Sequence, residues 1–156
     1  MEVNTTRFGK IDVNDDYVFK FLKPIIGYED ENEFVIIEHA HNSAFKWLQS
    51  VKTPELAFAL TMAAYFGIDY CFELSDDVQE LLGISSSEDI DVFNIAVIPH
   101  SNPRSSTINM LAPVIFNRKN KLAAQIILSG SNFEVSYPLF KQDENAKLKS
   151  EDKVKC

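Results

Sequence analysis

The sequence predicts an all-β domain with an antiparallel, β-barrel-like fold, either a pseudobarrel or a sandwich, that carries one or two short helices. The first observation is a series of about nine short apolar or aromatic segments separated by polar turns, which is typical of such folds. The second is the composition, with twelve phenylalanines and five tyrosines against only five glycines. We therefore expect one domain over residues 1–140, followed by a charged, disordered tail over residues 141–156.

The only tryptophan lies in the most distinctive pair of segments. Residues 45–51 and 56–60 are both apolar and rich in aromatics, and the polar stretch between them contains Pro54. This pattern predicts two adjacent strands of a hairpin, with Pro54 in the turn. Trp47 lies beside Gln49 and Ser50, so it suits either a protein interface or the core, and composition alone leaves both uses open.

The amino-terminal half otherwise consists of strands and turns. An opening hairpin is expected around Phe8 and Gly9, with arms at residues 3–7 and 10–13. Two further strands are expected at residues 17–22, which Pro24 stops, and at residues 34–38.

The centre of the chain holds the one clear helix signal. Residues 61–67 suit a helical turn as well as an extended segment and stay unassigned, whereas residues 70–74 are predicted to be a strand. Ser75 or Asp76 can cap a helix that Gly83 ends. The pattern places three apolar side chains on one face of this helix: Val78, Leu81 and Leu82.

The carboxyl-terminal half returns to strands. Residues 90–98 are nearly continuously apolar and predict a strand buried on both faces, in which Asn94 ties strands together through hydrogen bonds. Pro99 ends this strand, and a loop long enough to carry function follows at residues 100–106. The remaining strands are expected at three ranges: 107–116, 122–128 and 133–137.

The charge excludes some classes of partner. The formal net charge is −8, and because the tail carries five lysines against four acidic residues, residues 1–140 carry −9. Binding to a phosphate backbone relies on clustered Lys and Arg, so we expect no direct nucleic-acid contact.

No apolar run approaches the roughly 18 residues of a membrane span, and no export signal is visible, which predicts a cytosolic protein.

Motifs for catalysis are absent from the sequence. It has no Gly-rich phosphate loop, no Gly-x-Ser-x-Gly elbow and no zinc-type spacing of Cys or His. His39 and His41 lack a convincing third ligand, so we expect no metal, no cofactor and no enzymatic activity. The alternative is a small β-barrel that binds or converts a small molecule, with His39, His41 and His100 as its proton carriers.

Several distinctive segments follow one another along the chain: TTRFG at residues 5–9, FKWLQSV at 45–51 with Pro54, LAF at 56–58, YCFEL at 70–74, IP at 98–99, TINMLAP at 107–113 and Asn117. This ordered series resembles the flagellar assembly factor FliW family. The chain departs from the family pattern at residues 21–29, where the family often reads Phe-Pro-x-Gly-Leu-Pro-Gly-Phe-Glu, and at Ala59 and Ala63, where prolines are frequent.

The resemblance implies a non-enzymatic regulator with two protein partners. One partner is flagellin, bound through its terminal helical region, and the other is CsrA, the RNA-binding repressor of flagellin translation, which FliW proteins antagonise. Flagellin that accumulates before export would occupy the protein and leave CsrA free. We expect partner contacts on the most family-specific residues: Trp47, Leu48, Gln49, Ser50, Pro99, Thr107, Asn109 and Leu111.

The composition of the tail leads to a first prediction. Residues 141–156 contain no aromatic residue and only Leu148 and Val154 as sizeable apolar side chains. A chain shortened to residues 1–140 should therefore melt at nearly the same temperature as the full chain. Differential scanning calorimetry of both forms checks this, and a large fall in melting temperature would show that the tail packs on the domain.

Overall fold

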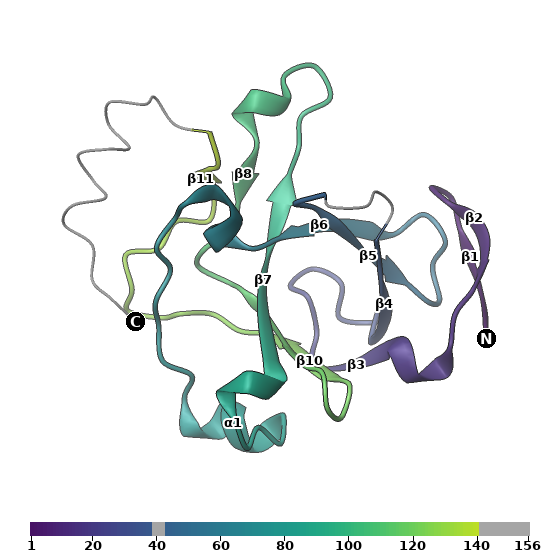
Figure 1. The fold of residues 1–156 in the computed structure, drawn as a ribbon, viewed down its shortest axis with the longest axis horizontal. Coiled ribbons are helices and arrows are strands. Elements are labelled where there is room, and N and C mark those ends of the chain that lie inside the picture. The colour runs from purple at the N-terminus through teal and green to yellow at the C-terminus, as the bar shows by residue number, and fades with distance from the viewer. Residues whose placement is uncertain (39–42, 141–156) are drawn as a thin grey trace.

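The computed structural model describes residues 1–38 and 43–140, so the predicted tail and the pair His39 and His41 lie outside the described residues. The described part contains one α-helix, α1 (Asp76–Leu81), and otherwise strands and short 3₁₀ turns (Figure 1). The strands are β1 (Glu2–Thr5), β2 (Gly9–Asp12), β3 (Val18–Lys23), β4 (Glu33–Ile37), β5 (Lys46–Ser50), β6 (Ala57–Thr61), β7 (Ile90–Val97), β8 (Thr107–Ile108), β9 (Val114–Asn117), β10 (Leu122–Gln125) and β11 (Tyr137–Pro138).

Seven strands close into a barrel. Their hydrogen-bonded order is β7-β6-β5-β4-β3-β10-β9, and β9 pairs again with β7, which completes the ring. The amino-terminal half of β7 pairs with β9 through Ile90 to Phe93, and its carboxyl-terminal half pairs with β6 and β8. The predicted all-β, barrel-like fold with few helices is confirmed.

One pairing in the ring differs from the predicted antiparallel arrangement. β3 and β10 run parallel, with Leu122 opposite Lys20, whereas the other pairings in the ring are antiparallel. A two-residue turn can join antiparallel strands, but parallel strands need a long connection. The many residues between β3 and β10 supply this connection. Because the two strands are so distant in the sequence, no local pattern predicts that they pair.

The barrel interior explains why the chain is rich in phenylalanine. Phe116 on β9 makes edge-to-face contacts with Phe19, Phe21 and Phe93 at ring-centroid distances of 4.9, 5.8 and 5.6 Å. Such contacts stabilise a core beyond the area that they bury. The other fully or nearly fully buried residues of this interior cluster include Phe34, Leu48, Leu60 and Val114.

Two smaller apolar clusters cover the outside of the barrel, and the segment at residues 70–74 links them. Tyr70 packs on the cluster that contains Trp47, and Phe72 and Leu74 pack on the cluster that contains α1. The predicted strand at residues 70–74 is wrong, because this segment makes no ladder. Its side chains do alternate between half-buried and exposed, so the period-two pattern recorded burial and not strand pairing.

Three predicted strands of the carboxyl-terminal half are shorter in the structure. The strand expected at residues 107–116 is interrupted after β8, because Asn109 Oδ1 accepts a hydrogen bond from Ala112 N at 2.9 Å and closes a turn before Pro113. The strand expected at residues 122–128 ends at Gln125. The last predicted strand is reduced to the two residues of β11, which pair with β8.

The helix α1 has the predicted caps. Ser75 Oγ accepts a hydrogen bond from Val78 N at 3.2 Å, and Gly83 follows the helix with a left-handed φ of +63°. Val78 and Leu82 are buried as expected, but Leu81 is 37% exposed, so the prediction that it shares their face is wrong. A helix of fewer than two turns contacts the barrel along a narrow stripe, which leaves no room for a third side chain.

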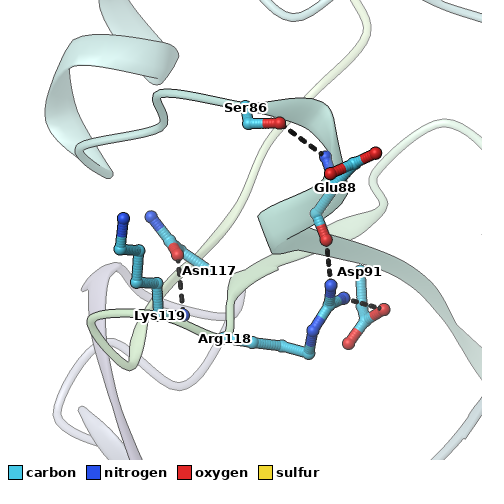
Figure 2. A network of polar contacts seen from close by, with 6 residues as sticks. All are labelled: Ser86, Glu88, Asp91, Asn117, Arg118 and Lys119. Atoms are coloured by element: carbon cyan, nitrogen blue, oxygen red, sulfur yellow. Dashed lines mark hydrogen bonds and ion pairs between the residues drawn. The ribbon is translucent and has the colours of Figure 1, made fainter.

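The β9–β10 turn holds the end of this helix and the start of β7. Asn117 Nδ2 and Asn120 Nδ2 donate to Leu82 O at 2.8 and 2.9 Å. Figure 2 shows the neighbouring contacts, in which Arg118 binds the Asp91 carboxylate at 2.5 Å and the Glu88 carbonyl. One short turn therefore joins three segments that are distant in the sequence.

The tryptophan hairpin, β5 and β6, is confirmed, and its turn is fixed by buried polar side chains. Gln49 Nε2 lies 3.1 to 3.3 Å from the carbonyl oxygens of Ser50, Thr53, Pro54 and Leu56. Outside this turn, the Glu31 carboxylate accepts hydrogen bonds from two hydroxyls: Ser50 Oγ at 2.5 Å and Thr53 Oγ1 at 2.6 Å. The turn is thereby tied to the loop that precedes β4.

The geometry at Gly83 yields a second prediction. A Cβ here would lie 2.9 Å from Asn120 Nδ2, which is itself held by its bond to Leu82 O, and φ is left-handed. Gly83→Ala should lower the free energy of unfolding by about 2–3 kcal/mol, because backbone strain and a disturbed hydrogen bond both contribute. Urea denaturation measures this loss.

Gly130→Ala is the matched control for this substitution. Gly130 has a φ of +79° and nothing within 4 Å of the added Cβ, so it carries only the left-handed backbone cost of about 1–2 kcal/mol. Equal losses in the two variants would show that the contact with Asn120 contributes nothing.

The Glu31 contacts yield a third prediction, on pH. Burial raises the pKa of this carboxyl, but the two hydroxyl donors and the charge of Lys52 outweigh burial and lower the pKa below its usual value. The stabilisation is therefore present above the pKa of the unfolded chain and is lost as the pH falls through the lowered folded-state pKa. Glu31→Gln should reduce the free energy of unfolding at neutral pH, and the difference from the parent should vanish in acid.

Urea denaturation at neutral and at acidic pH measures this difference, with Asp30→Asn as the control. That variant removes one charge from the same loop without touching the hydroxyl donors. A difference between parent and Glu31→Gln that stays constant with pH would contradict the assignment.

Candidate functional site

Two neighbouring concavities on the described surface share Ile26, Gln125 and Ile127 and form one groove. We call these two concavities together the apolar groove. The first has a volume of about 370 Å³ and is lined by Ile25, Ile26, Tyr28, Phe58, Ile95, Asn109, Leu111, Ala112, Gln125, Ile127 and Val135. The second has a volume of about 640 Å³, and its further lining consists of Lys23, Phe72, Glu73, Ser75, Val78, Ile126, Leu128, Ser129, Ser131 and Phe133.

Large apolar side chains are exposed along this groove. Ile26, Ile127 and Val135 are 57%, 56% and 57% exposed, and Tyr28 is 42% exposed. Single exposed apolar residues are ordinary on a protein surface, but a contiguous group around a concavity marks a binding surface. The apolar groove is therefore the candidate site for a partner with an apolar face.

Gln125 positions both walls of the first concavity. This side chain is 7% exposed, its Oε1 accepts a hydrogen bond from Ile26 N at 2.7 Å, and its Nε2 donates to Ala112 O at 3.1 Å. It lies at the end of β10, where the pairing of β3 with β10 stops. One buried amide thus fixes the spacing between the loop after β3 and the turn before β9.

Two further contacts shape the walls. The ring of Tyr28 stands edge-on to Phe58 at a centroid distance of 5.1 Å and an interplanar angle of 83°. Asn94, fully buried on β7, donates from Nδ2 to Asn109 O at 2.9 Å, which is the strand-tying role predicted for it. These contacts preorganise the groove, so a partner meets side chains that are already in place.

Two of the predicted contact residues, Asn109 and Leu111, line the groove. Leu48, Gln49 and Ser50 are each 0% exposed. Leu48 packs in the barrel interior, and the other two fix the hairpin turn, so their side chains present no surface to a partner in this conformation.

Trp47 lies on the other face of β5 and is half-buried. The Arg7 guanidinium carbon lies 3.8 Å from the centre of the indole, and the Phe8 ring stands edge-on at 6.5 Å. The rest of the side chain packs on an outer cluster with Ala59, Ala96 and Ile108. Strand alternation separates Trp47 from Leu48, whose cross-strand neighbour Phe58 lines the groove, so Trp47 and the groove occupy different faces.

Pro99 and Thr107 flank the loop after β7 and are both half-buried. Thr107 pairs with Val97 and with Pro138, at the end of the sheet that extends from the barrel. Val97 is 63% exposed there. Neither Pro99 nor Thr107 lines the apolar groove.

Sequence reasoning missed most of the groove. Ile26 and Tyr28 lie in a loop on either side of Gly27. Hydrophobic periodicity identifies helices and strands, so it does not detect exposed apolar residues in a loop. Ile127 falls just beyond the end of β10, and Gln125 resembles an ordinary polar strand residue until its two backbone partners are seen.

The described residues offer little for acid–base or metal chemistry. Within residues 1–38 and 43–140, no group of three or more His, Cys, Asp or Glu is placed to hold a metal ion. Burial raises the pKa of Tyr70, whose hydroxyl donates to Met110 O at 2.5 Å and which serves the packing of an outer cluster. His100 is exposed.

In the part of the chain that the structure describes, no helix is long and apolar enough to span a bilayer.

Comparison with known proteins points to one family. The family described as "FliW protein" matches residues 2–139. A flagellar assembly factor FliW from Ruminiclostridium cellulolyticum is 38% identical over 138 residues, which cover 88% of this chain and 93% of that protein. The FliW of Caldanaerobacter subterraneus subsp. tengcongensis is 34% identical over 147 residues, covering 94% of this chain and 97% of the relative.

A more distant relative and a solved structure agree. The flagellar assembly factor FliW of Bacillus subtilis is 33% identical over 139 residues, covering 89% of this chain and 96% of that protein. A crystal structure of the flagellar assembly factor FliW superposes with a TM-score of 0.84 at 27% identity, over 91% of this chain and 99% of the other. The chain with this seven-stranded barrel and apolar groove therefore belongs to the FliW family of flagellar assembly factors.

Proposed function

We propose that this protein is a non-enzymatic regulator in the cytosol that binds flagellin through its terminal helical region and antagonises the translational repressor CsrA. By exchanging these partners, it couples flagellin translation to flagellin export. The observation that carries the proposal is a preorganised apolar groove in a barrel of the FliW family.

The groove suits a helical segment of a partner protein. Helix-in-groove recognition places the apolar face of an amphipathic helix into a surface concavity. The two concavities, separated by Ile26 and Ile127, offer two positions for large apolar side chains of such a helix. Flagellin is the partner that we assign to this groove.

The charge of the domain suits CsrA. Residues 1–140 carry a net charge of −9, and an acidic domain steers a basic RNA-binding protein toward it through long-range attraction. We place the CsrA contacts outside the groove floor, since electrostatic attraction needs exposed carboxylates.

The competing function, binding or conversion of a small molecule, needs a cavity with convergent polar groups. Polar side chains are few in the first concavity, where Asn109 and Gln125 are engaged with the backbone. The first concavity therefore favours a protein partner over a small-molecule substrate.

Partner exchange gives the fourth prediction. A flagellin terminal fragment should release CsrA from this protein in proportion to the fraction of flagellin-bound protein, because a standard interface covers roughly 800 Å² per partner and would extend from the groove floor onto the surrounding carboxylates that attract CsrA. Size-exclusion chromatography with light scattering at increasing flagellin concentration measures the release. A stable three-way complex at saturating concentrations of both partners would end the exclusion scheme.

Ile127→Ser tests the groove in the same experiment. Ile127 is already 56% exposed, so the substitution should leave the melting temperature unchanged while weakening flagellin binding about tenfold. Tyr17→Ser is the control, because Tyr17 is 61% exposed and lines neither concavity. Equal flagellin affinity in both variants would remove the groove from the flagellin interface.

A further inference from the structure

The acidic residues of the domain are distributed unevenly along the chain. The segments that carry its loops and turns, residues 22–33, 72–78, 109–112 and 125–136, contain eight acidic residues and one basic residue, Lys23, a net charge of −7. The rest of residues 1–140 contains eleven acidic and nine basic residues, a net charge of −2. Most of the net negative charge of residues 1–140 therefore falls in the segments that supply most of the groove lining.

Four of these acidic residues are part of the groove lining or lie next to it in the chain. Glu29 and Asp30 directly follow Tyr28, and Glu134 directly precedes Val135. Glu73 lies between Phe72 and Leu74 and lines the second concavity. All four carboxylates belong to exposed residues, so they border the apolar floor without being buried in it.

We infer that the apolar groove takes an amphipathic helix whose apolar stripe is bordered by lysine or arginine. The apolar stripe fills the two concavities, while the long cationic side chains extend along the groove and reach the surrounding carboxylates with their charged ends. A helix bordered by acidic residues would meet like charges and be rejected. The inference rests on the proposed function, since it specifies the kind of helix that the same groove accepts.

The charge also argues against two other occupants. A second copy of this chain, docked through a two-fold interface, would place the groove against itself and bring like-charged acidic segments together. An anionic lipid surface would be repelled in the same way. A cationic helix is the occupant whose charge is complementary.

The test uses two model peptides of about 18 residues, roughly five helical turns. Both carry the same leucine stripe, bordered by lysine in one and by glutamate in the other. The lysine peptide should bind the full-length protein in fluorescence anisotropy, and its affinity should fall as salt rises from about 50 to about 500 mM. The glutamate peptide should bind at least about tenfold more weakly at the low salt concentration.

Two charge variants locate the effect. Glu29→Gln with Asp30→Asn and Glu134→Gln should weaken binding of the lysine peptide by about tenfold at low salt. Asp12→Asn with Asp15→Asn and Asp16→Asn removes the same number of charges from a segment that contributes no lining residue to either concavity, and should change the affinity far less. Circular dichroism melting of both variants confirms that they are folded.

Three outcomes would overturn the inference. These are equal binding of both peptides, an unchanged affinity in the first triple variant, and a concentration-dependent dimer that Ile127→Ser abolishes. A flagellin fragment measured on the same variants separates the two proposals. If flagellin binds the first triple variant as tightly as the parent, the proposed function is retained and this inference is wrong. If the lysine peptide binds and the flagellin fragment does not, the inference is supported and flagellin is not the partner.

Discussion

Closure of the barrel by strand β7 is the constraint on which the rest of the structure depends. β7 pairs with β9 through one half and with β6 and β8 through the other, so it must be long, apolar and continuous. Closure removes the free edges of the ring and encloses an interior that the aromatic contacts around Phe116 fill. The outer clusters and the helix α1 then pack on a support that is already rigid.

Buried side-chain amides on the barrel strands fix the positions of the neighbouring loops through hydrogen bonds. Gln49 fixes the tryptophan hairpin turn, Asn117 holds the end of α1, and Gln125 joins the two walls of the groove. Each of these side chains is at most 7% exposed and donates to backbone carbonyl oxygens that lie outside the regular ladders. A buried amide left without such partners would be costly, so each one specifies the position of a loop as well as stabilising it.

The apolar groove has a floor and a border of different chemistry, and this difference connects the fold with the proposed regulation. The groove floor consists of apolar side chains held by the barrel, and its border consists of exposed carboxylates on the loops. Apolar burial contributes affinity, and charges contribute association rate and selectivity between partners. Trp47, on a different face and covered in part by Arg7, shows that the most conspicuous residue of the sequence belongs to a separate surface.

The sequence by itself determined the fold class, the hairpins β1–β2, β5–β6 and β9–β10, and both caps of α1. These features depend on residues close together in the chain, such as Ser75 with Val78. Only the tertiary structure decided which side chains form the site. Gln49 and Ser50 look like surface residues in a list of polar positions, yet both are fully buried, whereas Ile26 and Ile127 look like core residues and are exposed. Ile26 and Ile127 follow the ends of β3 and β10, and the parallel pairing of these strands is a contact between distant segments that leaves no periodic signal in either one. Gln49 and Ser50 are buried because their side chains bind the hairpin turn and Glu31.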